Sequence, residues 1–133
     1  MKLSIVTITL NSEKTIRDTL NSVLSQTYKN IEHIIIDGGS SDKTFSLLKK
    51  CPNKNKKIFL KKNFGIYKSI NFGIKQATGK YVMILNSDDI FFSNNSIKEL
   101  IEVISYYKNI DIFLGNVVYF NEFNYSNIKR FYS

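Results

Sequence analysis

The sequence predicts an α/β domain in which helices cover both faces of a mainly parallel sheet. Two observations lead to this prediction. Apolar, β-branched runs of strand length alternate with segments of helical periodicity through most of the chain, and polar loops follow several of the strands. The chain has 133 residues, of which 43% are hydrophobic, enough for one domain with its own core and too few for two ordinary domains. We therefore expect residues 1–133 to form a single domain.

The first half of the chain reads as repeated strand and helix segments. The β-branched run at residues 3–9 predicts a strand, and apolar residues with helical spacing between residues 16 and 24 predict a helix that packs on the sheet. A second strand at residues 31–36 leads through a Gly-Gly turn into a helix around residues 45–48. A short strand at residues 57–60 follows a lysine-rich loop. These connections favour parallel neighbouring strands.

A third helix is expected between residues 63 and 79, with one apolar stripe facing the sheet. Gly73 lies inside this helix, where glycine costs about 1 kcal/mol relative to alanine. Its presence therefore indicates close packing or the approach of a ligand. The stripe consists of Ile66, Ile70, Ile74 and Ala77.

The most apolar stretch follows this helix. Residues 81–85 are bracketed by glycine and by an Asn-Ser-Asp-Asp sequence, which predicts a strand that is buried on both faces and ends in two carboxylates. Beyond it the sequence predicts a capped helix that includes residues 97–104, extended segments at 111–115 and 117–120 with a bend between them, a turn at 124–127 and a last strand at 128–132.

Charge and cysteine content narrow the possible functions. The chain carries a net charge of +8 and a single cysteine, which excludes an internal disulfide or a cysteine metal cluster. It shows neither a signal-peptide pattern nor an apolar run of the ~20 residues that a membrane helix needs, so we expect a cytoplasmic protein. Lysines cluster between residues 49 and 62, and we interpret them as a solvated face, with a peripheral membrane contact as the second interpretation. Nucleic-acid binding is disfavoured because only Phe59 interleaves with these lysines.

Three polar loops are expected at the carboxyl ends of strands, where open α/β sheets bind ligands. They lie at residues 9–11, 37–40 and 87–89. Asp88 and Asp89 follow an apolar strand, and two neighbouring carboxylates there require a compensating cation, proton or hydrogen-bonding ligand. Oxygen ligands without nearby histidine or cysteine suit Mg²⁺ or Mn²⁺. A turn followed by a helix cap is the alternative interpretation of this pair. Rossmann and Walker A fingerprints are absent from the sequence.

Six ordered motifs, which span almost the whole chain, resemble those of family 2 glycosyltransferases. That resemblance implies a Rossmann-like GT-A fold that binds a nucleotide-sugar. The motifs are SIVTITLN (4–11), SVLSQTY (22–28), DGGSSDKT (37–44), GIY (65–67) with NFGI (71–74), ATGKY (77–81) and LNSDD (85–89).

The resemblance also implies roles for individual residues. Thr9 and Asn11 would line the nucleotide pocket, and Asp37 would hydrogen-bond the base. Asp88 would lie beside the ribose or sugar, and Asp89 would bind the Mn²⁺ or Mg²⁺ ion that bridges the diphosphate. The residues expected to bind substrate are thus Thr9, Asn11, Asp37, Gly39, Lys68, Ser87 and Asp88, with Asp89 and Asp88 on the metal.

The implied reaction transfers a hexose-type sugar, with inversion, from a nucleotide-diphosphate sugar to a surface-glycan or lipid-linked acceptor; UDP-sugars are favoured as donors. Lys68 stands where the nearest family members usually have Asp, which would alter the sugar site. The segment with the catalytic base is expected beyond Ser133, so the chain would be a donor-binding half located in the cytoplasm or at the inner face of the membrane. A non-catalytic nucleotide or nucleotide-sugar binding module is the alternative.

Overall fold

The computed structural model describes residues 1–107, 109–115, 117–119 and 130–132. The chain divides into two compact units, Met1–Ile101 and Glu102–Ser133, each of which is described by itself. The first unit contains the main sheet and the three loops singled out above. The fold of this unit therefore determines the geometry of the site.

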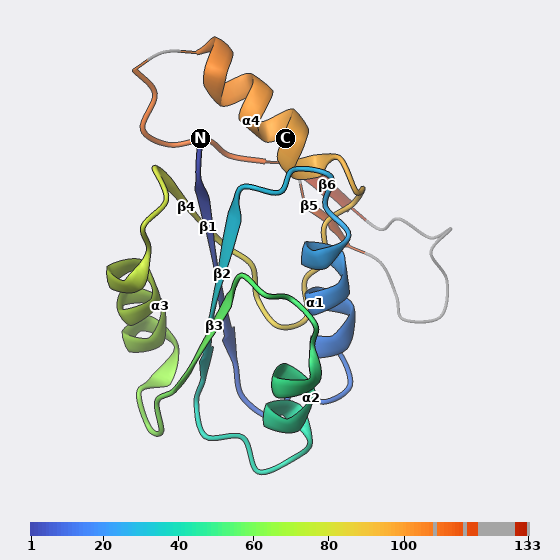
Figure 1. Cartoon of the computed structure of the whole chain (residues 1–133), viewed down its shortest axis with the longest axis vertical. Helices are drawn as coiled ribbons and strands as arrows, with labels where there is room; N and C mark the ends of the chain where they lie inside the picture. Colours follow the sequence, from blue (N-terminus) through green and yellow to red (C-terminus); the bar gives the residue numbers. More distant parts are fainter. Residues whose placement is uncertain (108, 116, 120–129, 133) are drawn as a thin grey trace. The chain divides into compact units, whose positions relative to one another are not determined.

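Four parallel strands form the main sheet in the order β3-β2-β1-β4 (Figure 1). They are β1 (Leu3–Thr9), β2 (Ile31–Asp37), β3 (Lys56–Leu60) and β4 (Tyr81–Ile84). Thr9 pairs with Asp37, so the first two strands end at the same level and their loops begin side by side. The predicted mainly parallel α/β sheet is confirmed.

Helices cover both faces of this sheet. Figure 1 shows α1 (Ile16–Leu24) and α2 (Thr44–Lys50) on one face and α3 (Gly65–Gln76) on the other. Successive strand residues alternate between the two sides: Ile35 packs with α1 and α2, whereas Ile34 and Ile36 pack with Val6 and Phe72 of α3. A third apolar cluster joins Leu3 and Ile5 to Val23 and to Ile97, in the first turn of α4 (Ser96–Tyr106).

The face that α3 turns to the sheet differs from the predicted stripe. Its buried residues are Ser69 and Gly73, while Ile66 is 63% exposed and Ile74 is also exposed. A Cβ atom on Gly73 would lie 2.4 Å from Cγ1 of Val6, so only glycine permits this close approach. The prediction of close packing at Gly73 is confirmed, and the prediction that Ile66 and Ile74 face the sheet is wrong.

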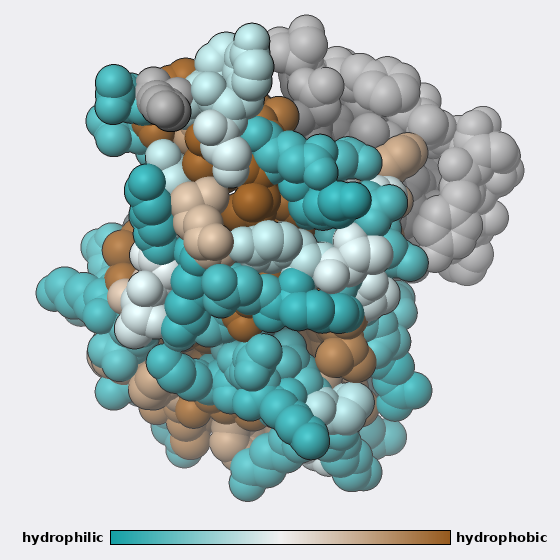
Figure 2. Space-filling view, turned by 45° about the horizontal axis from the view of Figure 1, so that its top comes forward, coloured by the Kyte–Doolittle hydropathy of each residue, from teal (hydrophilic) through white to brown (hydrophobic). Residues whose placement is uncertain are grey.

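The strand β4 lies at an edge of the described sheet. In the part of the chain that the structure describes, it pairs with β1 alone, and Val82 and Ile84 are 38% and 39% exposed. Tyr81 and Met83 pack against the core. The prediction of a strand buried on both faces is therefore wrong. In the view of Figure 2, apolar side chains reach the surface in small patches between hydrophilic ones.

The second unit contains a short antiparallel pair of strands. In it β5 (Val117–Tyr119) pairs with β6 (Arg130–Tyr132). Residues 111–115 form no regular element, so the extended segment predicted there is not a strand. The turn predicted at residues 124–127 lies outside the described residues. Among the helices that the structure describes, none has the length and apolar character needed to cross a bilayer.

Candidate functional site

The loops that follow β1 and β2 are joined by reciprocal hydrogen bonds. The amide of Gly38 donates to the carbonyl oxygen of Thr9 at 2.9 Å. The amide of Asn11 donates to Oγ of Ser40, and Oδ1 of Asn11 accepts from the amide of Ser41, both at 2.9 Å. Asn11 has a φ of +51°, a left-handed conformation that asparagine tolerates better than most residues. These contacts fix the two loops to one another at the carboxyl edge of the sheet.

A second set of contacts extends the connection as far as α2. Oδ2 of Asp42 accepts from the amide of Glu13 at 3.0 Å, and its Oδ1 accepts from the amide of Thr44 at 2.9 Å. Oε2 of Glu13 in turn accepts from the amide of Lys43 at 2.9 Å. Desolvation alone would raise the pKa of Asp42, but the hydrogen bonds from Thr44 and Glu13 hold this pKa below its ordinary value. Asp42 therefore stays ionised and keeps the start of α2 in place.

Asp37 is fully buried, and its carboxylate organises its own loop. Oδ1 accepts from the amides of Gly39 and Ser40 at 2.9 Å, and Oδ2 accepts from Oγ of Ser40 at 2.7 Å. Gly39 has a φ of +99°, and a Cβ atom there would lie 2.8 Å from Cγ of Lys62. The stem of Lys62 thus crosses directly over the loop. Because a carboxylate offers about four acceptor positions, Asp37 keeps limited capacity for a further donor.

The acidic loop after β4 reaches the other two loops through a serine pair. Oγ of Ser87 lies 2.8 Å from Oγ of Ser12. Within the loop, the amide of Asp89 donates to the carbonyl oxygen of Asn86 at 3.2 Å, and Nδ2 of Asn86 donates to Oδ2 of Asp89 at 3.0 Å. Asp88 and Asp89 are both exposed. The three loops predicted to converge therefore meet at one edge of the sheet.

Two other predicted residues have different surroundings. Thr9 is buried at the end of β1, and its hydroxyl has no hydrogen-bond partner among the residues that the structure describes. A buried hydroxyl without a partner is uncommon in proteins and leaves a donor for a ligand or water. Lys68 is exposed in the first turn of α3, and no hydrogen bond or ion pair described here links it to the three loops. Its place in the binding site stays a prediction.

The acidic pair suits a metal only together with a ligand. Among the described residues, no group of three or more His, Cys, Asp or Glu side chains could hold an ion. Neither Asp88 nor Asp89 forms an ion pair with a lysine or arginine among the described residues. Mg²⁺ and Mn²⁺ are commonly bound by one or two carboxylates and completed by substrate phosphates. The two aspartates fit such a site.

Ser12 and Ser40 are contact residues that the sequence analysis did not single out. Ser12 joins the first loop to the acidic loop, and Ser40 bonds both Asn11 and Asp37. Ser40 follows the two glycines of a turn, where a hydroxyl often hydrogen-bonds the local backbone, so a sequence signal existed. Ser12 has no comparable signal, because its partner lies 75 residues away.

Comparison with known proteins assigns the family. The sequence model described as "Glycosyl transferase family 2" matches residues 4–131. The chain belongs to this glycosyltransferase family. An uncharacterized family relative from Rickettsia bellii is 41% identical over 95 residues, which cover 70% of this chain and 14% of the relative. The poly-beta-1,6-N-acetyl-D-glucosamine synthase of Staphylococcus aureus is 46% identical over 82 residues, which cover 60% of this chain and 20% of that protein.

A solved structure shares the fold of this chain. Residues 1–349 of TarS from S. aureus, crystallised with UDP-GlcNAc, match with a TM-score of 0.74 and 32% identity. The match covers 80% of this chain and 32% of the TarS chain. The present glycosyltransferase chain thus spans about a third or less of these three relatives. The likeness agrees with the GT-A fold expected from the motifs.

Proposed function

We propose that this chain binds the nucleotide-sugar donor of a glycosyltransferase at the carboxyl edge of its sheet. The observation that carries this proposal is the meeting of three loops there, joined by the Ser12–Ser87, Asn11–Ser40 and Thr9–Gly38 hydrogen bonds. Two exposed carboxylates without ion-pair partners stand beside these joined loops. Such a rim can hold a diphosphate through hydroxyl groups, with a cation between phosphate and carboxylates.

Each residue of the site is assigned to one part of the donor or to the metal ion. Thr9 and Asn11 would face the nucleotide, Asp37 and Gly39 would shape the pocket for its base, and Ser87 would hold the acidic loop. Asp89 would bind Mn²⁺ or Mg²⁺, and Asp88 would contact the metal, the ribose or the sugar. Lys68 would add a positive charge near the sugar.

The chemistry of sugar transfer agrees with this residue set. A bound divalent ion acts as a Lewis acid and stabilises the charge that builds on the departing nucleoside diphosphate. Asp88 and Asp89 would orient that ion, and through it the diphosphate oxygens. A carboxylate base must also take the proton of the acceptor hydroxyl, and we assign no base within residues 1–133.

The donor proposed is a UDP-sugar, and UDP-GlcNAc is the first to test. TarS was crystallised with this compound, and the name of the S. aureus synthase contains the corresponding sugar. For the acceptor we propose a surface glycan or a lipid-linked sugar. A lipid-linked acceptor would bring a cytoplasmic transferase to the inner face of the membrane.

Calorimetric titration tests the donor site. We expect UDP and UDP-GlcNAc to bind more tightly with Mn²⁺ than without it, by roughly 10-fold or more, a coupling typical of two ligands that bind together. Asp89→Asn should remove this enhancement. Asp111→Asn, which removes an exposed carboxylate from the other unit, should keep it. Equal affinity with and without Mn²⁺, or no binding of any nucleotide diphosphate, would overturn the assignment.

A further inference from the structure

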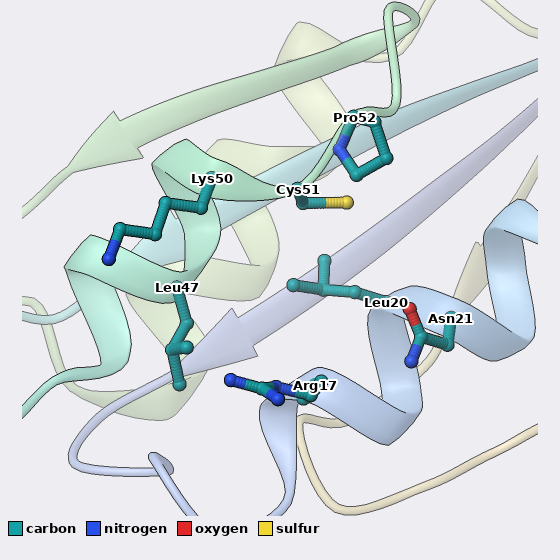
Figure 3. A pocket seen from close by; sticks show the side chains of 7 residues that line it. All are labelled: Arg17, Leu20, Asn21, Leu47, Lys50, Cys51 and Pro52. Atoms are coloured by element: carbon teal, nitrogen blue, oxygen red, sulfur yellow. The ribbon is translucent and has the colours of Figure 1, made fainter.

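A hollow of about 220 Å³ lies between α1 and α2 (Figure 3). These two helices are on the side of the sheet opposite α3 (Figure 1). Arg17 and Leu20 line it from α1, and Leu47 and Lys50 line it from α2, with Pro52 at one end. The hollow thus combines an apolar lining with two cationic side chains. It shares no residue with the three loops at the carboxyl edge.

Among the residues that the structure describes, no carboxylate forms an ion pair with either cation. Neither Arg17 nor Lys50 takes part in the two ion pairs of Glu32, which join it to Lys2 and Lys57. A pair of cations beside apolar side chains, with no neutralising acid, favours an anion that also carries an apolar part.

The positive charge of the protein is concentrated in one segment of the sequence. Residues 43–87 contain 11 lysines and no aspartate or glutamate, whereas the rest of the chain has more acidic than basic residues. This segment includes α2, β3 and α3. Lys49 and Lys54 flank Lys50 and are exposed. The outer side of α2 therefore presents a positive field to any large anionic surface.

The lining argues for a lipid rather than a nucleic acid. Stacking of bases requires aromatic side chains with an open face, and no aromatic residue lines the hollow. The aromatic residue of α2 is Phe45, and its side chain packs against the core. Nζ of Lys49 lies 4.7 Å from the centroid of the Phe45 ring. Leu20, Leu47 and Pro52 instead offer a surface for the glycerol and first methylene groups of a lipid.

We propose that the hollow between α1 and α2 holds the phosphate of an anionic phospholipid between Arg17 and Lys50, and that this docks the α2 side of the domain onto an anionic membrane. Arginine binds phosphate oxygens with a planar, two-pronged geometry, and lysine adds a point charge. The lysines flanking Lys50 add long-range attraction, which salt screens.

Vesicle flotation with the full chain tests the docking. We expect binding to vesicles of equal parts phosphatidylglycerol and phosphatidylcholine, and none to pure phosphatidylcholine. The Arg17→Gln/Lys50→Gln double variant should bind about 30-fold more weakly, since each basic group at an anionic surface contributes about a fivefold factor. The Lys75→Gln/Lys80→Gln variant removes the same charge from exposed positions in α3 and just before β4, and should lose less than about threefold.

If both double variants lose the same amount of vesicle affinity, the proposal of a specific phosphate site at Arg17 and Lys50 is overturned. Unchanged vesicle binding by Arg17→Gln/Lys50→Gln would also overturn it. Circular dichroism of both variants checks the fold, and UDP titration checks the donor site separately.

Glycerophosphoglycerol should compete with the vesicles, and inorganic phosphate should compete weakly. The chain can also be titrated with inorganic phosphate while the amide NMR signals of Arg17 and Lys50 are followed. If these signals shift but the chain binds no vesicles, the ligand of the hollow is free phosphate and the lipid assignment is overturned. The lipid assignment would also be overturned if a single-stranded DNA oligonucleotide bound more tightly than the vesicles and Arg17→Gln/Lys50→Gln lost that binding.

Discussion

The hydroxyl groups of Ser12 and Ser87 lie 2.8 Å apart, although 75 residues separate them in the chain. Their hydrogen bond connects the loop after β1 with the loop after β4. Asp88 and Asp89 follow Ser87 directly, so this contact fixes the point from which the two carboxylates project. We infer that the serine pair positions the acidic residues relative to the proposed diphosphate site.

Removal of either hydroxyl should weaken the metal-dependent binding of UDP. We expect Ser12→Ala and Ser87→Ala each to reduce the affinity measured with Mn²⁺ by about fivefold, corresponding to about 1 kcal/mol for one hydrogen bond. The double variant should lose little more than either single variant, because both remove the same contact. Ser46→Ala, on the exposed side of α2, is the matched control. Losses that simply add in the double variant would show that the serine pair does not act as a unit.

The neighbouring glycines of the β2 loop should respond differently to alanine. Gly39 has a φ of +99° and lies against Lys62, so Gly39→Ala combines backbone strain with a steric clash. We expect it to lower the free energy of unfolding by roughly 2 kcal/mol and to weaken UDP binding. At Gly38 a Cβ atom would meet its nearest neighbour at 3.5 Å, an ordinary contact. Gly38→Ala should therefore change stability by less than about 0.5 kcal/mol in urea unfolding. Similar losses at both positions would contradict this account.

The sequence predicted the strands and their loops because the strand signals are local. The run at residues 3–9 and the apolar residues 31–36 have high β-propensity and are followed by Asn-Ser and Gly-Gly loop signals. Parallel pairing then brings the loops to one edge, and the structure pairs Thr9 with Asp37 there. The convergence of the loops was thus deducible without coordinates.

Features that depend on tertiary contacts were not deducible. Helical periodicity placed Ile66 and Ile74 toward the sheet, but the contact between Gly73 and Val6 turns another side of α3 inward. The apolar composition of residues 81–85 is the same for a central strand as for an edge strand. It could therefore not show that β4 has one partner in the described sheet. The Ser12–Ser87 contact requires the strand order β2-β1-β4, which no local pattern encodes.

Glu32 lies buried in β2 and holds together the amino-terminal side of the sheet. Its Oε1 accepts from Oγ of Ser4 at 2.6 Å and from Oγ1 of Thr78 at 2.8 Å. Its Oε2 lies 3.1 Å from Nζ of both Lys2 and Lys57. Burial alone would raise the pKa of Glu32, but the hydrogen bonds from Ser4, Thr78 and Lys2 outweigh it and hold this pKa well below its usual range.

Replacement of Glu32 should destabilise the fold without a direct effect on the donor site. We expect Glu32→Gln to lower the free energy of unfolding at neutral pH by roughly 3 kcal/mol, since it breaks a buried charged network. The folded pKa lies below the unfolded one, so this stability is present above the ordinary pKa of 4.5 and declines as the pH falls below it. Urea unfolding at several pH values should show this decline in the parent chain and in Glu99→Gln, an exposed control, and a smaller decline in Glu32→Gln, where Asp42 still contributes. An unchanged decline in Glu32→Gln would exclude Glu32 as its source.

His33 should make stability depend on pH at milder acidity. It is the one histidine of the chain, fully buried in β2, with Nε2 2.9 Å from Oγ1 of Thr7. Burial, together with the charge of Lys56, lowers the pKa of His33 from 6.5 to about 4. The unfolded chain therefore takes up a proton that the folded chain refuses, and the free energy of unfolding should fall by roughly 3 kcal/mol between about pH 6.5 and pH 4. His33→Gln should remove the dependence in this window, while the single imidazole resonance in NMR should titrate near pH 4. Titration of that resonance near pH 6.5 would mean that the ring is reached by water in the folded state.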